Sequence, residues 1–439
     1  MTLKTVAFGA MALATLALLS GPSVAEDVTI SWWYESANPE QFRILEDSVI
    51  KPFEEANPGV NIEVEYRGEN LDQSLRLALL AGAGPDIVYG SGPSYIAPVA
   101  LAGQVLALDD YAKQYGWRDR LLPVSINVGT FNDHLYALPA SHEALGLFYN
   151  KTLFEKNGWS MPKTIDELEA FCDQMLKLGI VPLATGNASW RGSNEHYVSI
   201  ILNNVAGPDT FYKVLTGELP WTNPKFEEAI VKMAEWWDKG YFGPNYFSIG
   251  GEQAFAQLAT GETGIAPNGT WMFQFGKQYF EPTSQEMAFA SFPTAEGVPY
   301  PNYPIGVGAT FSINKNSQHP DVVAKFLDYV YTKEFYARLN SVWLGMWAVP
   351  LRDLQGVELG GEATPAYAEA MKSMSEAIAN NQYGYTTWTF LPPATDEYLI
   401  SGIEDVWLKK ITPHDYLAEL DRLFSEEKAG GKVPQTPLR

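Results

Sequence analysis

The first ninety residues switch repeatedly between apolar runs with strand character and apolar stripes with helical spacing. Residues 28–33 form an apolar run rich in β-branched and aromatic side chains, which predicts a buried strand. A helix is predicted from Asn38, a capping residue that is followed by proline at the first helical position. Residues 60–66 alternate as a second strand, 71–80 carry a helical stripe, and 87–89 form a third strand. This order predicts a parallel, doubly wound α/β sheet.

The pattern resumes after residue 140 and predicts a second α/β unit. Thr164 and Glu167 have the spacing of a capping box, and an apolar stripe with helical spacing follows them. Residues 226–237 predict another amphipathic helix. Residues 321–331 predict a third, which follows a strand at 310–313.

The N-terminus has the three parts of a secretory signal. Lys4 supplies a positive start, and residues 6–19 form an apolar run that is shorter than the roughly 20 residues a membrane span needs. Small residues at 23–25 match the site that a signal peptidase reads. We therefore expect residues 1–25 to be a signal peptide, and the mature protein to be soluble outside the cytoplasm.

Composition and charge exclude several classes of function. The 439 residues include 30 basic and 52 acidic side chains, for a net charge of −22, which disfavours nucleic acid and anionic membrane surfaces as partners. The single cysteine, Cys172, excludes an intramolecular disulfide, a cysteine-based zinc site and an iron–sulfur cluster. No phosphate-loop, dinucleotide or metal motif is present, so we expect no cofactor and no metal.

Aromatic residues are abundant, at 13%, and some of them follow predicted strands. In open α/β sheets, ligands bind beyond the carboxyl ends of the strands. There the chain has Trp33, Tyr34 and Glu35 after the first strand, and Ser91 and Gly92 after the third. Aromatic rings beside polar groups suit a polyhydroxylated ligand. The alternative is that Trp33 packs in the core of a sheet covered on both faces.

Several sequence segments resemble family 1 of the extracellular solute-binding proteins, the periplasmic receptors of carbohydrate ABC importers, which include maltose-binding protein. The order and spacing of these segments are specific, and the resemblance covers nearly the whole mature chain. The segments are 53–64 (FEEANPGVNIEV), 84–88 (GPDIV), 135–139 (LYALP), 147–154 (LFYNKTLF), 162–168 (PKTIDEL) and 268–271 (NGTW).

The resemblance implies a fold and a function. It implies two doubly wound α/β lobes, joined by hinge strands, with a ligand cleft between them. The N-terminal lobe would comprise residues 26–138 and 288–331, and the C-terminal lobe residues 139–287 and 332–439. The protein would be a non-enzymatic, monomeric receptor that captures a disaccharide or short oligosaccharide and delivers it to membrane permease subunits by hinge bending.

The resemblance also implies site residues. Glu143 has the spacing of a family acid that bonds sugar hydroxyls, and Trp271 that of a tryptophan that stacks on a sugar ring. For Trp343, Trp347 and Trp388, packing in the core is an equal alternative to a place at the cleft. The other residues implied at the cleft are His142, Trp190, Arg191, Asn194, Gly306, Gly308, Trp347 and Trp388.

Two other functions remain open from the residues. A secreted glycosidase or lyase could use a pair of carboxylates such as Glu35 and Glu143. A receptor for an anionic sugar or another polar solute could hold its ligand with Arg191 or Arg67. The turn at 90–93 departs from maltose-binding protein, which disfavours maltodextrin as the ligand.

Overall fold

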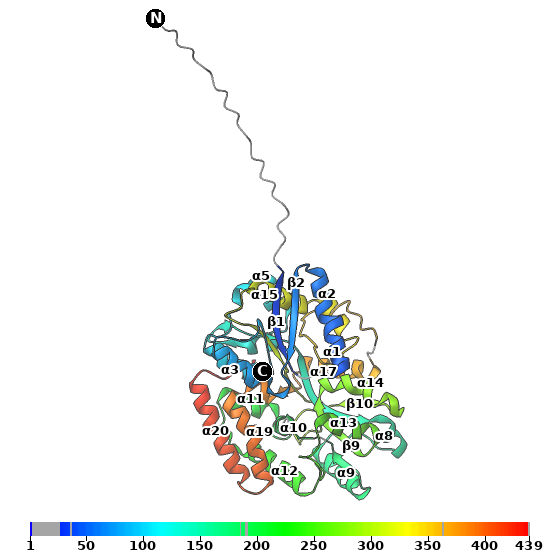
Figure 1. The fold of residues 1–439 in the computed structure, drawn as a ribbon. Helices are drawn as coiled ribbons and strands as arrows, with labels where there is room; N and C mark the ends of the chain where they lie inside the picture. The colour runs from blue at the N-terminus through cyan, green and yellow to red at the C-terminus, as the bar shows by residue number, and fades with distance from the viewer. Residues whose placement is uncertain (2–26, 36, 185, 189–191, 362–363, 438–439) are drawn as a thin grey trace.

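The structure, a computed structural model, describes residues 1, 27–35, 37–184, 186–188, 192–361 and 364–437. These residues form two lobes, each built on a sheet with helices packed around it (Figure 1). The expected signal peptide lies almost entirely outside the described residues, as do Trp190 and Arg191. No helix among the described residues is long and apolar enough to cross a membrane.

The first lobe contains the parallel strands expected from the sequence, with two later strands added antiparallel. β1 lies between β2 and β3 and is parallel to both, while β12 is antiparallel to β3 and β6. The strand order is β2 (Val60–Tyr66), β1 (Val28–Tyr34), β3 (Ile87–Gly90), β12 (Thr310–Ile313) and β6 (Leu138–Pro139).

The helix expected from Asn38 is present as three consecutive segments. The Asn38 side chain accepts a hydrogen bond from the backbone amide of Gln41. The Gln41 side chain in turn accepts one from the backbone amide of Asn38, which completes a capping box. The segments are α1 (Pro39–Ile44), a π-helical turn (Leu45–Ile50) and α2 (Lys51–Ala56). The other helices of this lobe are α3 (Leu71–Leu80), α4 (Pro93–Leu101), α5 (Asp109–Tyr115), α6 (Trp117–Arg120), α7 (Pro123–Ile126), α15 (Pro320–Val330) and α16 (Lys333–Leu339).

The second lobe has a mixed sheet centred on the long strand β7. β7 is antiparallel to β9, β10 and β11, while β8 pairs with β9 and β13 with β11 in parallel. The strands are β13 (Tyr383–Tyr385), β11 (Tyr303–Val307), β7 (His142–Asn150), β9 (Thr263–Gly269) and β8 (Val181–Leu183), with β10 (Met287–Ala290) beside β7.

Helices of different lengths, several of them long and amphipathic, pack around the second sheet. α9 begins at the capping box of Thr164 and Glu167, and Cys172 lies on its buried face. The helices are α8 (Lys151–Asn157), α9 (Ile165–Lys177), α10 (Gly192–Asn204), α11 (Pro208–Thr216), α12 (Pro224–Asp238), α13 (Gly251–Thr260), α14 (Gly276–Tyr279), α17 (Pro365–Ala379), α18 (Thr387–Phe390), α19 (Pro393–Trp407) and α20 (Pro413–Ala429).

The hydrophobic cores divide the chain at other positions than the expected lobe boundaries. β10 and β11, between residues 287 and 307, pair with β7 of the second sheet. Residues 309–351 pack in the first core, including Trp343 and Trp347. We therefore propose that the first lobe comprises 27–140 and 309–351, because these residues share one core.

Two neighbouring segments pass from one sheet to the other. The first continues from β6 into β7, and the second from β11 into β12. The amide of Ala140 donates a hydrogen bond to the carbonyl of Ala309 at the crossing, 2.7 Å away. These paired crossings bring the end of β3, the start of β7 and the residues after β11 together.

Candidate functional site

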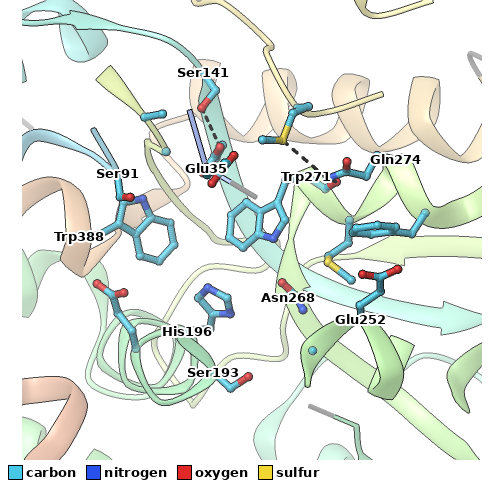
Figure 2. A pocket seen from close by; sticks show the side chains of 18 of the residues that line it. Glu35, Ser91, Ser141, Ser193, His196, Glu252, Asn268, Trp271, Gln274 and Trp388 are labelled. Atoms are coloured by element: carbon cyan, nitrogen blue, oxygen red, sulfur yellow. Dashed lines mark hydrogen bonds between the residues drawn. The ribbon is translucent and has the colours of Figure 1, made fainter. Parts of the chain in front are cut away.

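A cavity of about 430 Å³ opens where the two lobes meet (Figure 2). Glu35 and Ser91 reach it from the carboxyl ends of β1 and β3 in the first lobe. Glu143 on β7, and Trp271 and Trp388 after β9 and β13, reach it from the second lobe. The cavity therefore has one wall from each lobe, with the crossing segments between them.

Two tryptophans form the aromatic part of the lining. Trp271 lies in a 3₁₀ turn (Thr270–Phe275) directly after β9, and Trp388 lies in α18. Their ring centroids are 5.9 Å apart with an interplanar angle of 76°. The His196 ring lies 5.1 Å from Trp271 and 5.6 Å from Trp388. Trp388 is 4% exposed, and its indole Nε1 has no hydrogen-bond partner among the described residues.

Two carboxyl groups face the cavity from opposite lobes. Burial raises the pKa of Glu143 to about 8, and the nearby charge of Glu35 adds to the rise. Ser141 Oγ opposes this by donating a 2.7 Å hydrogen bond to Glu143 Oε1. Burial likewise raises the pKa of Glu35 to about 7, with a contribution from the Asp72 charge.

Close backbone contact fixes the position of the Glu143 carboxyl. A Cβ added to Gly308 would lie 1.8–2.0 Å from its three carboxyl atoms. The crossing segment after β11 therefore runs directly against this carboxyl group, and a side chain at this position would displace it.

A third carboxyl, from Glu195 on α10, lies in the cavity wall beside a buried partner. The Thr387 hydroxyl donates a 3.0 Å hydrogen bond to Glu195 Oε1. Burial raises the pKa of Glu195, and burial together with the Glu195 charge raises that of Asp396 well above its ordinary range. Both carboxyl groups are therefore harder to ionise than exposed ones.

The two buried histidines near the cavity are neutral. Burial lowers the pKa of His196 to about 3 and that of His142 to about 4. Among the residues that the structure describes, no group of three or more potential metal ligands is found. The lining therefore offers aromatic surface, carboxyl groups and amides.

Comparison with known families identifies the kind of protein that carries this cavity. The model of the bacterial extracellular solute-binding proteins matches residues 36–337, more than half of the chain. The chain belongs to this family. Its members are binding proteins and not enzymes.

Individual relatives agree with this assignment. An ABC transporter extracellular-binding protein of Pyrococcus horikoshii is 27% identical over 324 residues, which cover 71% of this chain and 69% of the relative. The diacetylchitobiose binding protein of Streptomyces coelicolor is 24% identical over 71% of this chain and 67% of its own. The structure of a chitin oligosaccharide binding protein, 21% identical, has the same fold with a TM-score of 0.79; it covers 92% of this chain and is itself covered completely.

In this solute-binding protein, part of the site expected from the sequence is brought together. The expected residues that line the cavity are Glu35, Ser91, Glu143, Trp271, Gly308 and Trp388. They come from six separate stretches of the chain, and the crossing segments bring them together.

Three expected aromatic residues of the solute-binding protein lie elsewhere. Trp33 alternates with the buried Trp32 and Tyr34, so it lies on the opposite face of β1, where the Arg67 guanidinium is 3.7 Å from its ring centroid. Tyr34 is 1% exposed in the first core. Trp347 is fully buried, 5.7 Å from the Trp32 ring. These aromatic residues pack within the first lobe and do not line the cavity.

Four other expected residues of the solute-binding protein are also held away from the lining. His142 pairs with Ser125, and Asn194 bonds Asn187, Tyr246 and Glu404 in a buried network. Gly306 lies against Thr386. Gly92 is the N-cap residue of α4 and lies beside the backbone carbonyl of Trp388. Their contacts are with other residues of the protein.

Sequence reasoning missed several lining residues. Tyr89 precedes the turn at 90–93, and Asn268 opens the NGTW segment. Both therefore lie next to residues that were predicted at the cleft. Glu195 and His196 lie on α10, which is buried on all sides and carries no amphipathic signal. Gln274 follows Trp271 by one helical turn and accepts a hydrogen bond from Trp343 Nε1.

Proposed function

We propose that this protein is the sugar-capturing receptor of an ABC importer. The observation that carries the proposal is the interlobe cavity, which has tryptophan rings and carboxyl groups in its walls, in a member of the solute-binding family. A sugar ring presents apolar C–H faces to aromatic rings, and its hydroxyl groups bond to polar side chains. Relatives named for binding diacetylchitobiose and chitin oligosaccharides support a saccharide ligand.

The proposed ligand is a disaccharide or short oligosaccharide. A volume of about 430 Å³ falls within the range of roughly 300–1,000 Å³ that is typical of small-molecule sites. Trp271 and Trp388 are nearly perpendicular, so two rings of an oligosaccharide could each contact one of them. Bending at the paired crossings would close the lobes over the sugar.

The proposed setting follows from the family. Residues 1–25 direct the chain to the periplasm, where the closed monomer docks on the membrane subunits and releases its sugar. The two alternatives find less support. The family is one of binding proteins, which disfavours a glycosidase. Arg67, one proposed anion ligand, stacks on Trp33 away from the cavity lining.

A binding screen with the purified mature chain tests the proposal. Mono-, di- and oligosaccharides are added in turn while heat of binding and tryptophan fluorescence are recorded, and chromatography checks each sugar for breakdown. We expect one sugar class to bind without turnover, and small-angle scattering to show a smaller radius of gyration in its presence. Release of products would contradict the receptor function, and so would failure of every saccharide to bind.

A further inference from the structure

The polar lining of the cavity is dominated by carboxyl groups. The lining includes four glutamates, which are Glu35, Glu143, Glu195 and Glu252. Within the part of the chain that the structure describes, neither lysine nor arginine lines the cavity. The described part of the lining therefore contributes negative charge to the cavity whenever these groups are ionised.

Several hydrogen-bond donors of the lining are already used within the protein. The hydroxyl hydrogens of Ser91, Ser141 and Ser193 are donated to a carboxyl group or a backbone carbonyl. Gln274 donates its amide hydrogen to the Trp271 carbonyl at 3.0 Å. When the carboxyl groups of the lining are ionised, they add acceptors to the cavity and no donors, because an ionised carboxylate accepts hydrogen bonds and donates none.

Glu35 and Glu143 lie close enough for the charge of one to affect the other, and no positive charge is among the groups that shift either pKa. Burying two such carboxyl groups without a cation is costly, and a cation placed between them would offset that cost. A neutral sugar cannot supply this charge. An ammonium group supplies it together with three donors and no acceptor.

The aromatic walls suit a cation as well as a sugar face. An ammonium group is attracted to the face of a tryptophan ring within about 6 Å of its centroid. Trp271 and Trp388 stand beside the carboxyl groups in the same cavity. His196 between them is uncharged at neutral pH and does not repel a cation.

We propose that the ligand is a cationic amino sugar, whose ammonium group is held by Glu35 and Glu143 while its ring packs on Trp271. This inference rests on the proposed sugar-receptor function and names its substrate class. The remaining hydroxyl groups of the sugar meet Glu195 and Asn268.

Matched saccharides that differ in one substituent test the inference. The set contains glucosamine oligomers, their N-acetylated forms and glucose oligomers of the same linkage, with the corresponding galactose and mannose compounds. Calorimetry near neutral pH measures each affinity. We expect the amine to bind at least about tenfold more tightly than its hydroxyl or acetamido counterpart, the value of a charged hydrogen bond.

The outcomes separate this inference from the proposed function. Tighter or equal binding of a neutral sugar overturns the amino-sugar inference and leaves the receptor function standing. If no saccharide of either kind binds, the receptor function itself fails.

Isosteric variants provide a second test. Glu35→Gln and Glu143→Gln keep the shape of the side chain and remove its charge. Each is expected to weaken amine binding about tenfold more than it weakens the binding of a neutral counterpart. Glu63→Gln, on the exposed face of β2, is the control, and circular dichroism verifies folding. Equal losses for amine and neutral sugars would overturn the inference.

Discussion

Gly308 shows how a residue without a side chain shapes the cavity. A Cβ at this position would overlap the Glu143 carboxyl at 1.8–2.0 Å, in a segment that crosses between the lobes. We expect Gly308→Ala to displace Glu143 and to lower ligand affinity at least about tenfold. Calorimetry with the sugar found in the screen measures this effect.

Gly360→Ala is the matched control for this substitution. An added Cβ at Gly360 would meet its nearest atom at an ordinary 3.8 Å. Its affinity should equal that of the wild type. A Gly308→Ala variant with unchanged affinity would show that the Glu143 position is not needed for binding.

The two tryptophans Trp271 and Trp33 distinguish the cavity from the outer face of β1. Trp271→Ala removes a lining ring and should cost about 2 kcal/mol of binding free energy, or roughly thirtyfold in Kd. Trp33→Ala removes a ring that lies under Arg67 and should leave Kd unchanged. Fluorescence titration of both variants checks the pair, and the opposite order of losses would refute the assignment.

At the scale of elements, local patterns predicted what local physics determines. The alternation in β2, the cap at Asn38 and the capping box of α9 each specify an element from neighbouring residues. The position of β11 could not be read in this way, because its partner β7 lies more than 150 residues earlier. For this reason the expected boundaries assigned β11 to the N-terminal lobe, whereas it pairs with β7 in the second sheet.

In the candidate site too, residues in recognisable local segments could be predicted, and residues whose role depends on distant partners could not. Trp271 and Glu143 belong to recognisable segments, whereas the role of Glu195 depends on Thr387 and Asp396, about 200 residues away along the chain. Trp347 was expected at the cleft, but the segment that carries it folds into the first core. A tryptophan in a loop gives the same local signal in either place.

Substitution of Trp347 tests its core role. Trp347 is fully buried and contacts the rings of Trp32, Phe311 and Phe335. Trp347→Ala should lower the free energy of unfolding by about 3–5 kcal/mol, because it leaves a large cavity. Urea denaturation measures the loss. Unchanged stability combined with a large loss of affinity would show that Trp347 binds the ligand and does not stabilise the core.

At the scale of the whole molecule, the buried cavity carboxyls couple folding to pH. Burial holds the pKa of Glu35 near 7 and that of Glu143 near 8, against about 4.5 for an exposed glutamate. The folded chain therefore keeps protons that the unfolded chain has released. Since the unfolded state binds fewer protons, the free energy of unfolding must fall as the pH rises toward 8.

Other groups oppose this trend only at lower pH. His142 and His196 stay neutral in the folded chain, with pKa values of about 4 and 3, so their effect begins below pH 6.5, where unfolded histidine gains a proton. Between pH 6.5 and 8 the raised carboxyls dominate. Over this interval, each raised carboxyl group lowers the free energy of unfolding by about 1–2 kcal/mol.

We therefore expect the ligand-free protein to lose stability between pH 6.5 and 8, as measured by urea denaturation at each pH. Glu143→Gln, which cannot ionise, should show a shallower decline because one of the coupled protons is gone. Glu63→Gln, on the solvent face of β2, should follow the wild type. Identical slopes for all three proteins would mean that Glu143 ionises normally in the cavity, and a rising slope would reverse the sign of the linkage.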